Sequence, residues 1–323
     1  MWQDYYKQPS KDNWSGRVDK GGKRFHETVK LQDATELNWQ INEGEVALIG
    51  FCSDEGVARN KGRRGAAEGP AAFRSQLATL AHHQTECPPM VDLGDIVCLE
   101  GRLEDAQKAL GELIDLAFGH KLRPFVVGGG HEVAWAHYLG FKTHPKTDDL
   151  AIVNYDAHLD MRPIPTPGAS SGTPFLQIAQ HRQSMGFKFD YSCLGFQAQA
   201  NHQGLVETAS KYDVKILSAS DLMMDTSQAI EVLKPVLESE RGIYLTICLD
   251  VFSSSIACGV SAPQSLGILP HHILPSLKAI AESGQLLSFD IAELSPPLDK
   301  NNQTAHLAAS LFYFVCSHWT QSI

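Results

Sequence analysis

Three residues at alternating positions form the clearest candidate for chemistry in this chain. Asp156, His158 and Asp160 follow the apolar run Leu150 to Tyr155. In extended backbone, side chains two residues apart project from the same face, so the two carboxylates and the imidazole are expected to converge. Oxygen and nitrogen ligands in this mixture suit a divalent ion of the Mn²⁺ type. A polar strand end that caps a neighbouring helix would show the same pattern, so the motif alone leaves both interpretations open.

A second candidate ligand follows three glycines. Phe125 to Val127 has the composition of a buried strand, and it is followed by Gly128 to Gly130 and by His131-Glu132 at the start of an expected helix. Glycine permits positive φ and close approach of the backbone to a bound group, so the stretch suits a ligand-bearing turn. The alternatives are a phosphate-binding turn, although G-x-G-x-x-G and G-K-[ST] are both absent, and a histidine that only begins a helix.

A third apolar run, Tyr244 to Phe252, also carries residues capable of chemistry. Its alternation is expected to place Thr246, Cys248 and Asp250 on one face of a strand. An aspartate buried at the end of such a strand costs free energy unless it is paired, hydrogen-bonded or bound to a metal. Asp250 is therefore a further candidate ligand.

Asp290 and Glu293 end the last run of this kind, which begins at Leu287. Taken alone, they are more simply interpreted as solvated loop charges. In parallel sheets, however, ligands bind beyond the carboxyl ends of the strands, where loops from several strands meet. Four runs that end in chemically capable side chains therefore predict one shared site.

The elements that must position this site alternate along the chain from residue 45 onward. Arg102 to Phe118, for example, repeats apolar residues at spacings of three and four, which predicts a helix. Strands that alternate with helices imply right-handed crossovers and a parallel sheet covered on both faces. We therefore predict an α/β fold with three α/β/α layers and a single, mostly parallel sheet of about eight strands. The expected strands are Glu45 to Phe51, Met90 to Val97, Pro124 to Val127, Leu150 to Tyr155, Tyr191 to Phe196, Val214 to Leu217, Gly242 to Val251 and Leu286 to Ile291.

Residues 1–44 are expected to form an N-terminal arm packed on the core. Trp2, Tyr5, Tyr6 and Trp14 stand there among many charges. Neither a Gly/Ser linker nor an internal repeat interrupts the remainder of the chain. Residues 45–323 are therefore predicted to form a single domain.

The composition limits the partners. A chain of 323 residues that is 43% hydrophobic can bury a sizeable core, and its formal net charge of −10 argues against nucleic acid or an anionic membrane as the main partner. The seven cysteines are scattered and include no C-x-x-C pair, which fits free thiols in a reducing cytoplasm. Neither a signal segment nor a membrane span is expected. We expect a cytoplasmic protein with a small-molecule substrate, and assembly into a homo-oligomer stays open.

Together, and in this order, these stretches resemble the ureohydrolase superfamily of arginases and agmatinases, an α/β/α family that binds two manganese ions. Gly128 to His131 match its G-G-[DG]-H element, and Asp156 to Asp160 match its D-A-H-x-D element. Asp290 to Pro296 match the closing acidic element before a proline. The resemblance covers residues 46–316 and implies hydrolysis of a linear amidine or guanidine C–N bond.

The resemblance also implies a set of metal ligands. Two Mn²⁺ ions per subunit would be bridged by Asp156. His131, Asp156 and Asp160 would serve one ion. Asp156, His158 and Asp250 would serve the other. A metal-bound hydroxide would then attack the amidine carbon, because bound cations lower the pKa of water.

Two departures from the family pattern argue against an arginase. Cys248 stands where the family usually places a bridging aspartate, and Ser253 replaces a third acidic residue. The loop Ser170 to Phe175 also lacks the histidine that arginases carry there. One sulfur offers Mn²⁺ a poorer bond than a bridging carboxylate, so an asymmetric centre with a weakly held second ion is predicted. Whether Cys248 is itself a ligand stays open.

Several stretches resemble the branch of the superfamily that cleaves N-formimidoyl-L-glutamate to L-glutamate and formamide in histidine degradation. They are Asn13 to Asp19, Asn60 to Ala66 followed by Gly69-Pro70, Arg162, and Ser170 to Phe175. A substrate with two carboxylates needs arginines inside an acidic protein, because guanidinium groups bind carboxylates bidentately. At least one of the candidate arginines is expected to be a solvated surface residue instead. The residues expected to bind the substrate are Asn60, Arg63, Arg162, Ser171 and Thr173, with Arg64 as a further candidate.

Glu293 would hold and orient the nitrogen end of the substrate. The proton for the leaving amine would come by way of Asp160 or Glu132. Three rivals stay open: an agmatinase or guanidino-acid hydrolase, a zinc deacylase of similar topology, and an inactive metal-binding homologue, which only Cys248 suggests.

Overall fold

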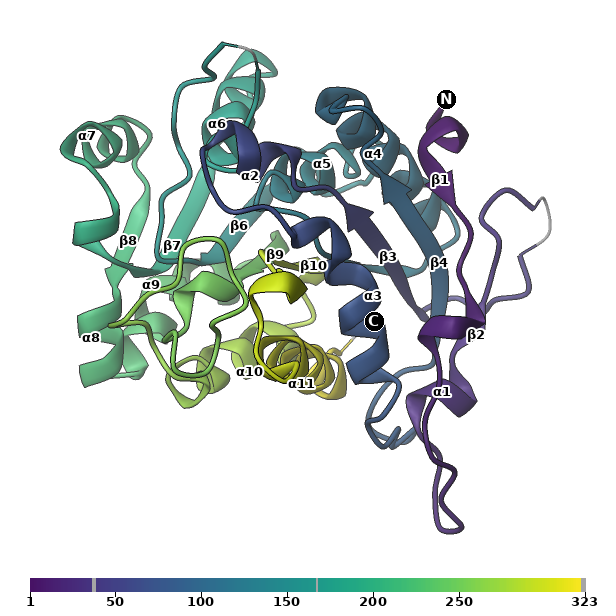
Figure 1. Ribbon diagram of the computed structural model, residues 1–323. Helices are drawn as coiled ribbons and strands as arrows, with labels where there is room; N and C mark the ends of the chain where they lie inside the picture. Colours follow the sequence, from purple (N-terminus) through teal and green to yellow (C-terminus); the bar gives the residue numbers. More distant parts are fainter. Residues whose placement is uncertain (37–38, 167, 321–323) are drawn as a thin grey trace.

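The computed structural model describes residues 1–36, 39–166 and 168–320, and Figure 1 shows a central sheet with helices on both faces. The strands are β1 (Tyr6–Lys7), β2 (Lys30–Leu31), β3 (Val46–Cys52), β4 (Met90–Val97), β5 (Arg123–Val127), β6 (Leu150–Tyr155), β7 (Asp190–Phe196), β8 (Lys215–Ser218), β9 (Gly242–Cys248) and β10 (Leu286–Ala292). In the described residues they form one sheet of ten strands in the order β1-β4-β3-β5-β10-β9-β6-β7-β8, with β2 paired to β4. Only the pairing of β1 with β4 is antiparallel among them. The predicted fold class is confirmed.

The eight predicted strands correspond to β3 to β10 within a few residues. The two additional strands, β1 and β2, belong to the first 44 residues and pair with β4 near the edge of the sheet. They were not predicted, because two residues are too few to show an alternating pattern. The division into an arm and a single domain stays a prediction.

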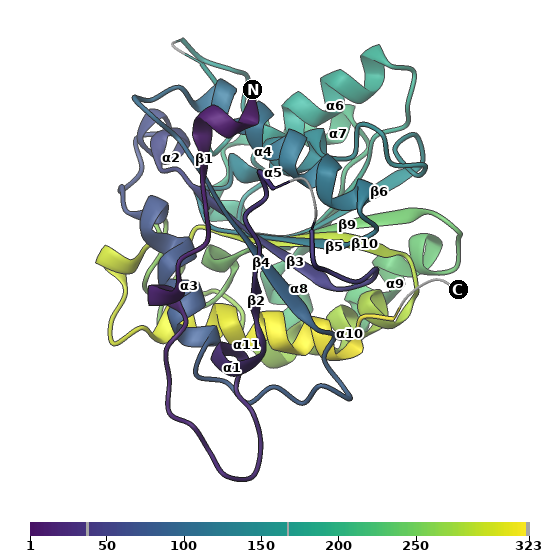
Figure 2. The same ribbon diagram turned by 90° about the vertical axis from the view of Figure 1, so that its right-hand side faces the viewer.

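Helices cover both faces of the sheet, as the edge-on view in Figure 2 shows. On one face lie α4 (Leu103–Gly119), α5 (Val133–Leu139), α6 (Pro174–Ser184) and α7 (Gln203–Lys211). On the other lie α3 (Gly69–Leu77), α8 (Ala219–Met224), α9 (Ser227–Leu237), α10 (Leu274–Glu282) and α11 (Gln303–His318). Among the described residues, no helix has both the length and the apolar composition needed to cross a membrane.

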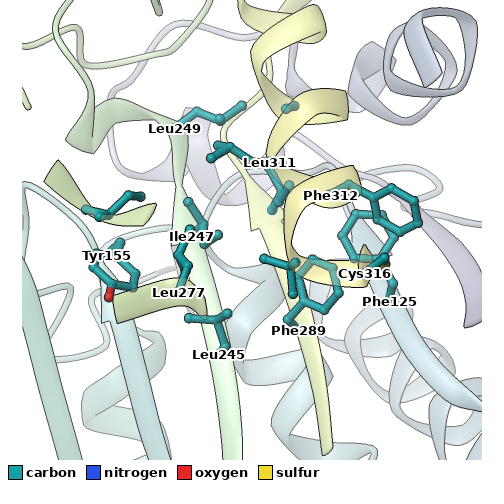
Figure 3. Close-up of a cluster of buried hydrophobic side chains, with 14 of the residues drawn as sticks. Phe125, Tyr155, Leu245, Ile247, Leu249, Leu277, Phe289, Leu311, Phe312 and Cys316 are labelled. Carbon is teal, nitrogen blue, oxygen red and sulfur yellow. The ribbon is translucent and has the colours of Figure 1, made fainter. Parts of the chain in front are cut away.

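Aromatic packing supports the centre of the sheet on the face of α3, α10 and α11. Figure 3 shows Phe125 of β5, Phe289 of β10 and Phe312 of α11 side by side. The ring centroids of Phe125 lie 4.6 Å from those of both Phe289 and Phe312, and all three side chains are fully buried. Such clusters stabilise a fold through buried apolar area and ring contacts. β5 and β10 are therefore held firmly beneath the loops that follow them.

The loops that follow β6 and β9 differ from the extended backbone that we predicted. β6 ends at Tyr155, so Asp156 to Asp160 lie beyond the strand, and Asp160 has a left-handed φ of 45°. β9 ends at Cys248, and Asp250 lies in the short 3₁₀ helix η5 (Leu249–Val251). The predicted alternation on one strand face is therefore wrong for these residues. Their side chains meet through loop conformation instead.

A buried ion-pair cluster connects α3 and the N-terminal segment to β4. Arg74 is 1% exposed, and its Nε and Nη2 atoms donate to the two oxygens of Asp92 at 2.8 Å. Its Nη1 atom donates to Asp95 Oδ1 at 2.6 Å. Trp14 Nε1 donates to Asp92 Oδ2 at 2.9 Å. One guanidinium thus pairs with two carboxylates of β4.

Arg74→Met is expected to lower the free energy of unfolding by about 3–5 kcal/mol, because it leaves two buried carboxylates without their cation. Urea unfolding followed by circular dichroism measures the change. Arg102→Met is the matched control, since Arg102 is 52% exposed and its nearest carboxylate, on Glu100, lies 3.9 Å away. The control should change stability by less than about 0.5 kcal/mol. Equal unfolding midpoints for the two variants would contradict the prediction.

Candidate metal centre and substrate cavity

The carboxyl ends of β5, β10, β9 and β6 are neighbours in the sheet, and the segments that follow them line one cavity of about 430 Å³. Residues from the segments around positions 60, 171, 201 and 261 complete its wall. The structure thus brings together four strand ends that are far apart in the sequence. Ten of the predicted site residues line this cavity: Asn60, Arg63, His131, His158, Asp160, Arg162, Ser171, Cys248, Asp250 and Glu293.

The first group of candidate ligands surrounds His131. Its Nδ1 atom lies 2.8 Å from Asp156 Oδ2 and 3.1 Å from Asp160 Oδ2. Cys248 belongs to the same group. Each of His131, Asp156 and Cys248 offers one ligand atom, and these three atoms lie within 4.8 Å of one another. The glycines before His131 permit this turn, since Gly128 and Gly129 have φ values of 97° and 73°.

The second group shares Asp156 with the first. His158 Nδ1 lies 3.3 Å from Asp156 Oδ1 and 3.1 Å from Asp250 Oδ2. Ligand atoms of these three residues also lie within 4.8 Å of one another. Asp156 is fully buried, and Asn154 Nδ2 donates to its Oδ2 atom at 3.2 Å. Its two carboxylate oxygens therefore face two different imidazoles, so Asp156 could serve both groups of ligands.

These residues fit a pair of divalent cations. Among the described residues, His131 Nδ1 and Asp250 Oδ1 are buried and take part in no hydrogen bond. Such orphaned buried atoms are rare and require an explanation. Burial lowers the pKa of His131, but the charges of Asp156 and Asp160 raise it well above the ordinary value. The site therefore favours positive charge where the oxygen and nitrogen atoms converge, which suits Mn²⁺.

Glu293 lies beside the two groups with a left-handed φ of 69°. Its backbone N–H donates to Gly129 O at 2.9 Å, and its Oε1 atom accepts from the His131 backbone N–H at 3.1 Å. Its Oε2 atom is buried and accepts no hydrogen bond from the described residues. Burial, and then the charges of Asp250 and Glu132, raise the pKa of Glu293 to about 8. A cationic nitrogen group bound nearby would favour the ionised form.

Lys61, Arg63 and Arg162 bring positive charge to the cavity wall. Arg63 is tied to the opposite loop, because its Nε donates to Ser261 O at 3.1 Å and its Nη2 donates to Val260 O at 2.8 Å. The side chains of Lys61 and Arg162 make no hydrogen bond or ion pair with the described part of the chain. These two cations are therefore the ones available to an anionic ligand.

The loop after residue 168 contains two residues that were predicted to bind the substrate. One lines the cavity, and the other is buried in the protein interior. Ser171 lines the cavity and accepts a hydrogen bond from Asn60 Nδ2 at 3.2 Å. Thr173 is fully buried, and its hydroxyl oxygen lies 2.9 Å from Ser170 O and 2.7 Å from Gln177 Oε1, within hydrogen-bonding distance of both. The expected substrate contact of Thr173 is corrected accordingly. Its side chain holds the loop and does not line the cavity.

Two other predicted residues lie outside the cavity lining. Glu132 is fully buried and accepts hydrogen bonds from Ser53 Oγ at 3.0 Å and from the Gly56 backbone N–H at 3.1 Å. Burial raises its pKa to about 7. Arg64 is 57% exposed and pairs with two carboxylates at the start of α2 (Glu55–Arg59). Glu132 therefore holds the chain around α2 in place. Arg64 is the candidate arginine that lies at the surface, as was expected of at least one of them.

Lys61 is a charged cavity residue that sequence reasoning missed. It stands within the stretch Asn60 to Ala66, whose positive charge was the available signal, and it has a left-handed φ of 62°. Asn201 and Ser261 also line the cavity. No pattern in the sequence distinguishes these two from other polar loop residues.

Residues 44–317 match the sequence model of the arginase family. The chain belongs to the arginase family. A formimidoylglutamase of Geobacillus sp. strain WCH70 is 39% identical over 311 residues, which cover 94% of each chain. A formimidoylglutamase of Legionella pneumophila strain Philadelphia 1 is 42% identical over 303 residues, which cover 92% of each chain. The family predicted from the strand-end motifs is confirmed.

Solved structures from this family share the fold. The formiminoglutamase of Trypanosoma cruzi solved with Mn²⁺ has a TM-score of 0.76 at 26% identity, covering 88% of this chain and 97% of that one. The formimidoylglutamase from Bacillus subtilis strain 168 has a TM-score of 0.82 at 20% identity, covering 96% of each chain. The second comparison concerns the fold alone.

Cys248 points into the centre of this arginase-family site. It pairs with Ala292 in the sheet register, it is 1% exposed, and it lies beside His131 and Asp156. The strand register therefore turns Cys248 toward the cavity. Burial, together with the charges of Asp156 and Asp250, raises the pKa of its thiol well above the ordinary value. A neutral thiol supplies one negative charge less than the aspartate of the family pattern.

Cys248→Asp is expected to tighten binding of the second Mn²⁺ by about tenfold, which is about 1.4 kcal/mol. The added carboxylate supplies two hard oxygens and a negative charge where sulfur binds Mn²⁺ poorly. Isothermal titration of metal-depleted protein measures this affinity. Cys316→Ser is a control, because Cys316 is also a buried thiol but lies on α11 and does not line the cavity. Two tightly held ions in the unmodified protein, with no gain from Cys248→Asp, would refute the asymmetric centre.

Proposed function

We propose that this chain hydrolyses N-formimidoyl-L-glutamate to L-glutamate and formamide, using two Mn²⁺ ions per subunit. The observation that carries the proposal is the division of one cavity into two chemical parts. Carboxylates and imidazoles form one part, and the unpaired cations of Lys61 and Arg162 form another. A substrate with an amidine group and two carboxylates matches both parts, and the relatives named formimidoylglutamase support this choice.

Each end of the substrate has a proposed partner. When bound, the divalent cations supply Lewis-acid chemistry that polarises water and the amidine group. Glu293 accepts hydrogen bonds from the amidine nitrogens through its unpaired Oε2 atom and stabilises their positive charge. Arg162 and Lys61 bind the carboxylates, and Arg63 holds the loop at Ser261 in place. Positioning between these groups presents the amidine carbon for attack.

Protonation of the leaving amine needs a group within reach of the substrate. Asp160 lines the cavity, whereas Glu132 does not. We therefore propose that Asp160, and not Glu132, carries the proton to the glutamate nitrogen as the C–N bond breaks.

A substrate screen tests the proposed function. With Mn²⁺ added, the protein should hydrolyse N-formimidoyl-L-glutamate and leave agmatine and L-arginine nearly unchanged, because the cations in the cavity wall repel cationic tails. Release of L-glutamate and formamide identifies the proposed reaction, and release of urea identifies hydrolysis of agmatine or L-arginine. Faster turnover of agmatine or arginine than of N-formimidoyl-L-glutamate would favour another member of the arginase family.

The same proposal includes a metabolic pathway and a cellular location. The proposed reaction belongs to histidine degradation. All seven cysteines are free in the structure, which supports a reducing cytoplasmic environment.

A further inference from the structure

A chain of buried hydrogen bonds runs from the candidate ligand His131 into the core of the sheet. His131 Nε2 lies 3.0 Å from Thr246 Oγ1 on β9. Thr246 Oγ1 donates to Asp290 Oδ1 on β10 at 2.6 Å, and these two residues are register partners in the sheet. Thr246 and Asp290 are fully buried, and His131 is 1% exposed. Water therefore cannot substitute for any of these contacts.

The direction of the hydrogen bonds follows from the chemistry of the partners. An ionised carboxylate only accepts, so the single hydroxyl proton of Thr246 is directed to Asp290. The Thr246 oxygen must then accept from His131, which places a proton on His131 Nε2. In the neutral imidazole the lone pair is then on Nδ1, the atom that faces Asp156 and Asp160. Metal-binding histidines are oriented by such contacts of the second ring nitrogen.

Asp290 is itself held by further donors. His137 Nδ1 lies 2.7 Å from Asp290 Oδ2, and Tyr244 Oη donates to the same oxygen at 2.5 Å. On its other side, His137 Nε2 lies 2.8 Å from Ser288 Oγ. All of these side chains are fully buried on α5, β9 and β10. Asp290 is thus fixed between secondary-structure elements and cannot rotate away from Thr246.

We propose that Thr246, Asp290 and His137 form a positioning relay, which holds the proton of His131 on Nε2 and presents Nδ1 to a cation. The proposal rests on the metal centre of the proposed function but not on its substrate. It gives a specific role to Asp290, which the sequence placed only among the chemically capable residues at the strand ends. The relay contacts His131 and none of the ligands His158, Asp160 and Asp250 directly, so it acts on one of the two cation sites.

Thr246→Val tests the relay because valine keeps the shape of the side chain and removes the hydroxyl. We expect Mn²⁺ affinity at one site to fall roughly 10- to 100-fold, with the other site unchanged. Thr246→Ser, which restores the hydroxyl, should bind both ions like the unmodified protein. Ser276→Ala is the matched control: it removes a buried hydroxyl 2.6 Å from Tyr155 Oη on β6, and Tyr155 has no link to the relay. Isothermal titration with MnCl₂ and metal analysis of the dialysed proteins give affinity and stoichiometry.

Unchanged Mn²⁺ affinity in Thr246→Val would overturn the relay, as would a protein that binds no Mn²⁺ at all. If Thr246→Val does not fold, Ser288→Ala at the far end is measured instead. A fall in the Mn²⁺ affinity of Ser288→Ala of about threefold or more supports the relay, and an unchanged Mn²⁺ affinity overturns it. A wrong proposed function would give a different result from a wrong relay. The unmodified protein would then bind Mn²⁺ but would not hydrolyse N-formimidoyl-L-glutamate.

Discussion

His131→Ala and Asp156→Ala are expected to abolish hydrolysis while the protein stays folded. His131 offers its Nδ1 atom to the first ligand group, and Asp156 belongs to both groups. Losing either removes a ligand that no neighbouring side chain can replace. We expect kcat/KM to fall on the order of 10³-fold or more, which corresponds to about 4 kcal/mol of transition-state stabilisation.

The measurement pairs activity with bound metal. Both variants should retain their circular dichroism spectrum, because these residues lie in loops beyond the strand ends. Metal analysis should show loss of Mn²⁺, with the larger loss in Asp156→Ala, since Asp156 serves both groups. His82→Ala is the matched control, because His82 is a buried histidine that does not line the cavity. Turnover like that of the unmodified protein in either ligand variant would remove the metal assignment.

Arg162→Ala is expected to raise KM for N-formimidoyl-L-glutamate steeply. The Arg162 side chain lines the cavity and has no partner among the described residues, so a substrate carboxylate is the charge it can bind. Loss of a charged contact of this kind costs about 2–3 kcal/mol for a partly exposed side chain. This is a fall of about 30- to 150-fold in kcat/KM. Lys61→Ala should act in the same direction with a smaller effect, because an ammonium group makes no bidentate contact.

Arg64→Ala is the matched control for both substitutions. Arg64 is an arginine of the same loop, but it pairs with Asp54 and Glu55 outside the cavity. Its substitution should change kcat/KM by less than about twofold. Steady-state kinetics at saturating Mn²⁺ separate KM from kcat. If Arg162→Ala and Arg64→Ala behave alike, the carboxylates of the substrate are bound elsewhere or the substrate is different.

The sequence by itself determined the layers, the strands and the family. Runs such as Leu150 to Tyr155 are long enough for their composition to predict a buried strand, and the helix at 103–119 shows its period over several turns. The rule that ligands gather at the carboxyl ends of parallel strands then predicted which stretches would meet. β1 and β2 escaped prediction, because two-residue strands form only where β4 offers an edge to pair with.

Only the tertiary structure decided where individual side chains point in the loops. Ser171 lines the cavity and Thr173 is buried, although the two stand two residues apart; likewise Arg63 lines the cavity and its neighbour Arg64 does not. Loops have no repeating geometry, so spacing says nothing about direction there, in contrast to strands. Asp290 lies within β10, where its strand was predicted, but its partners were not. Its role became visible only when β5, β9 and β10 came together and brought His131, Thr246 and His137 within hydrogen-bonding reach.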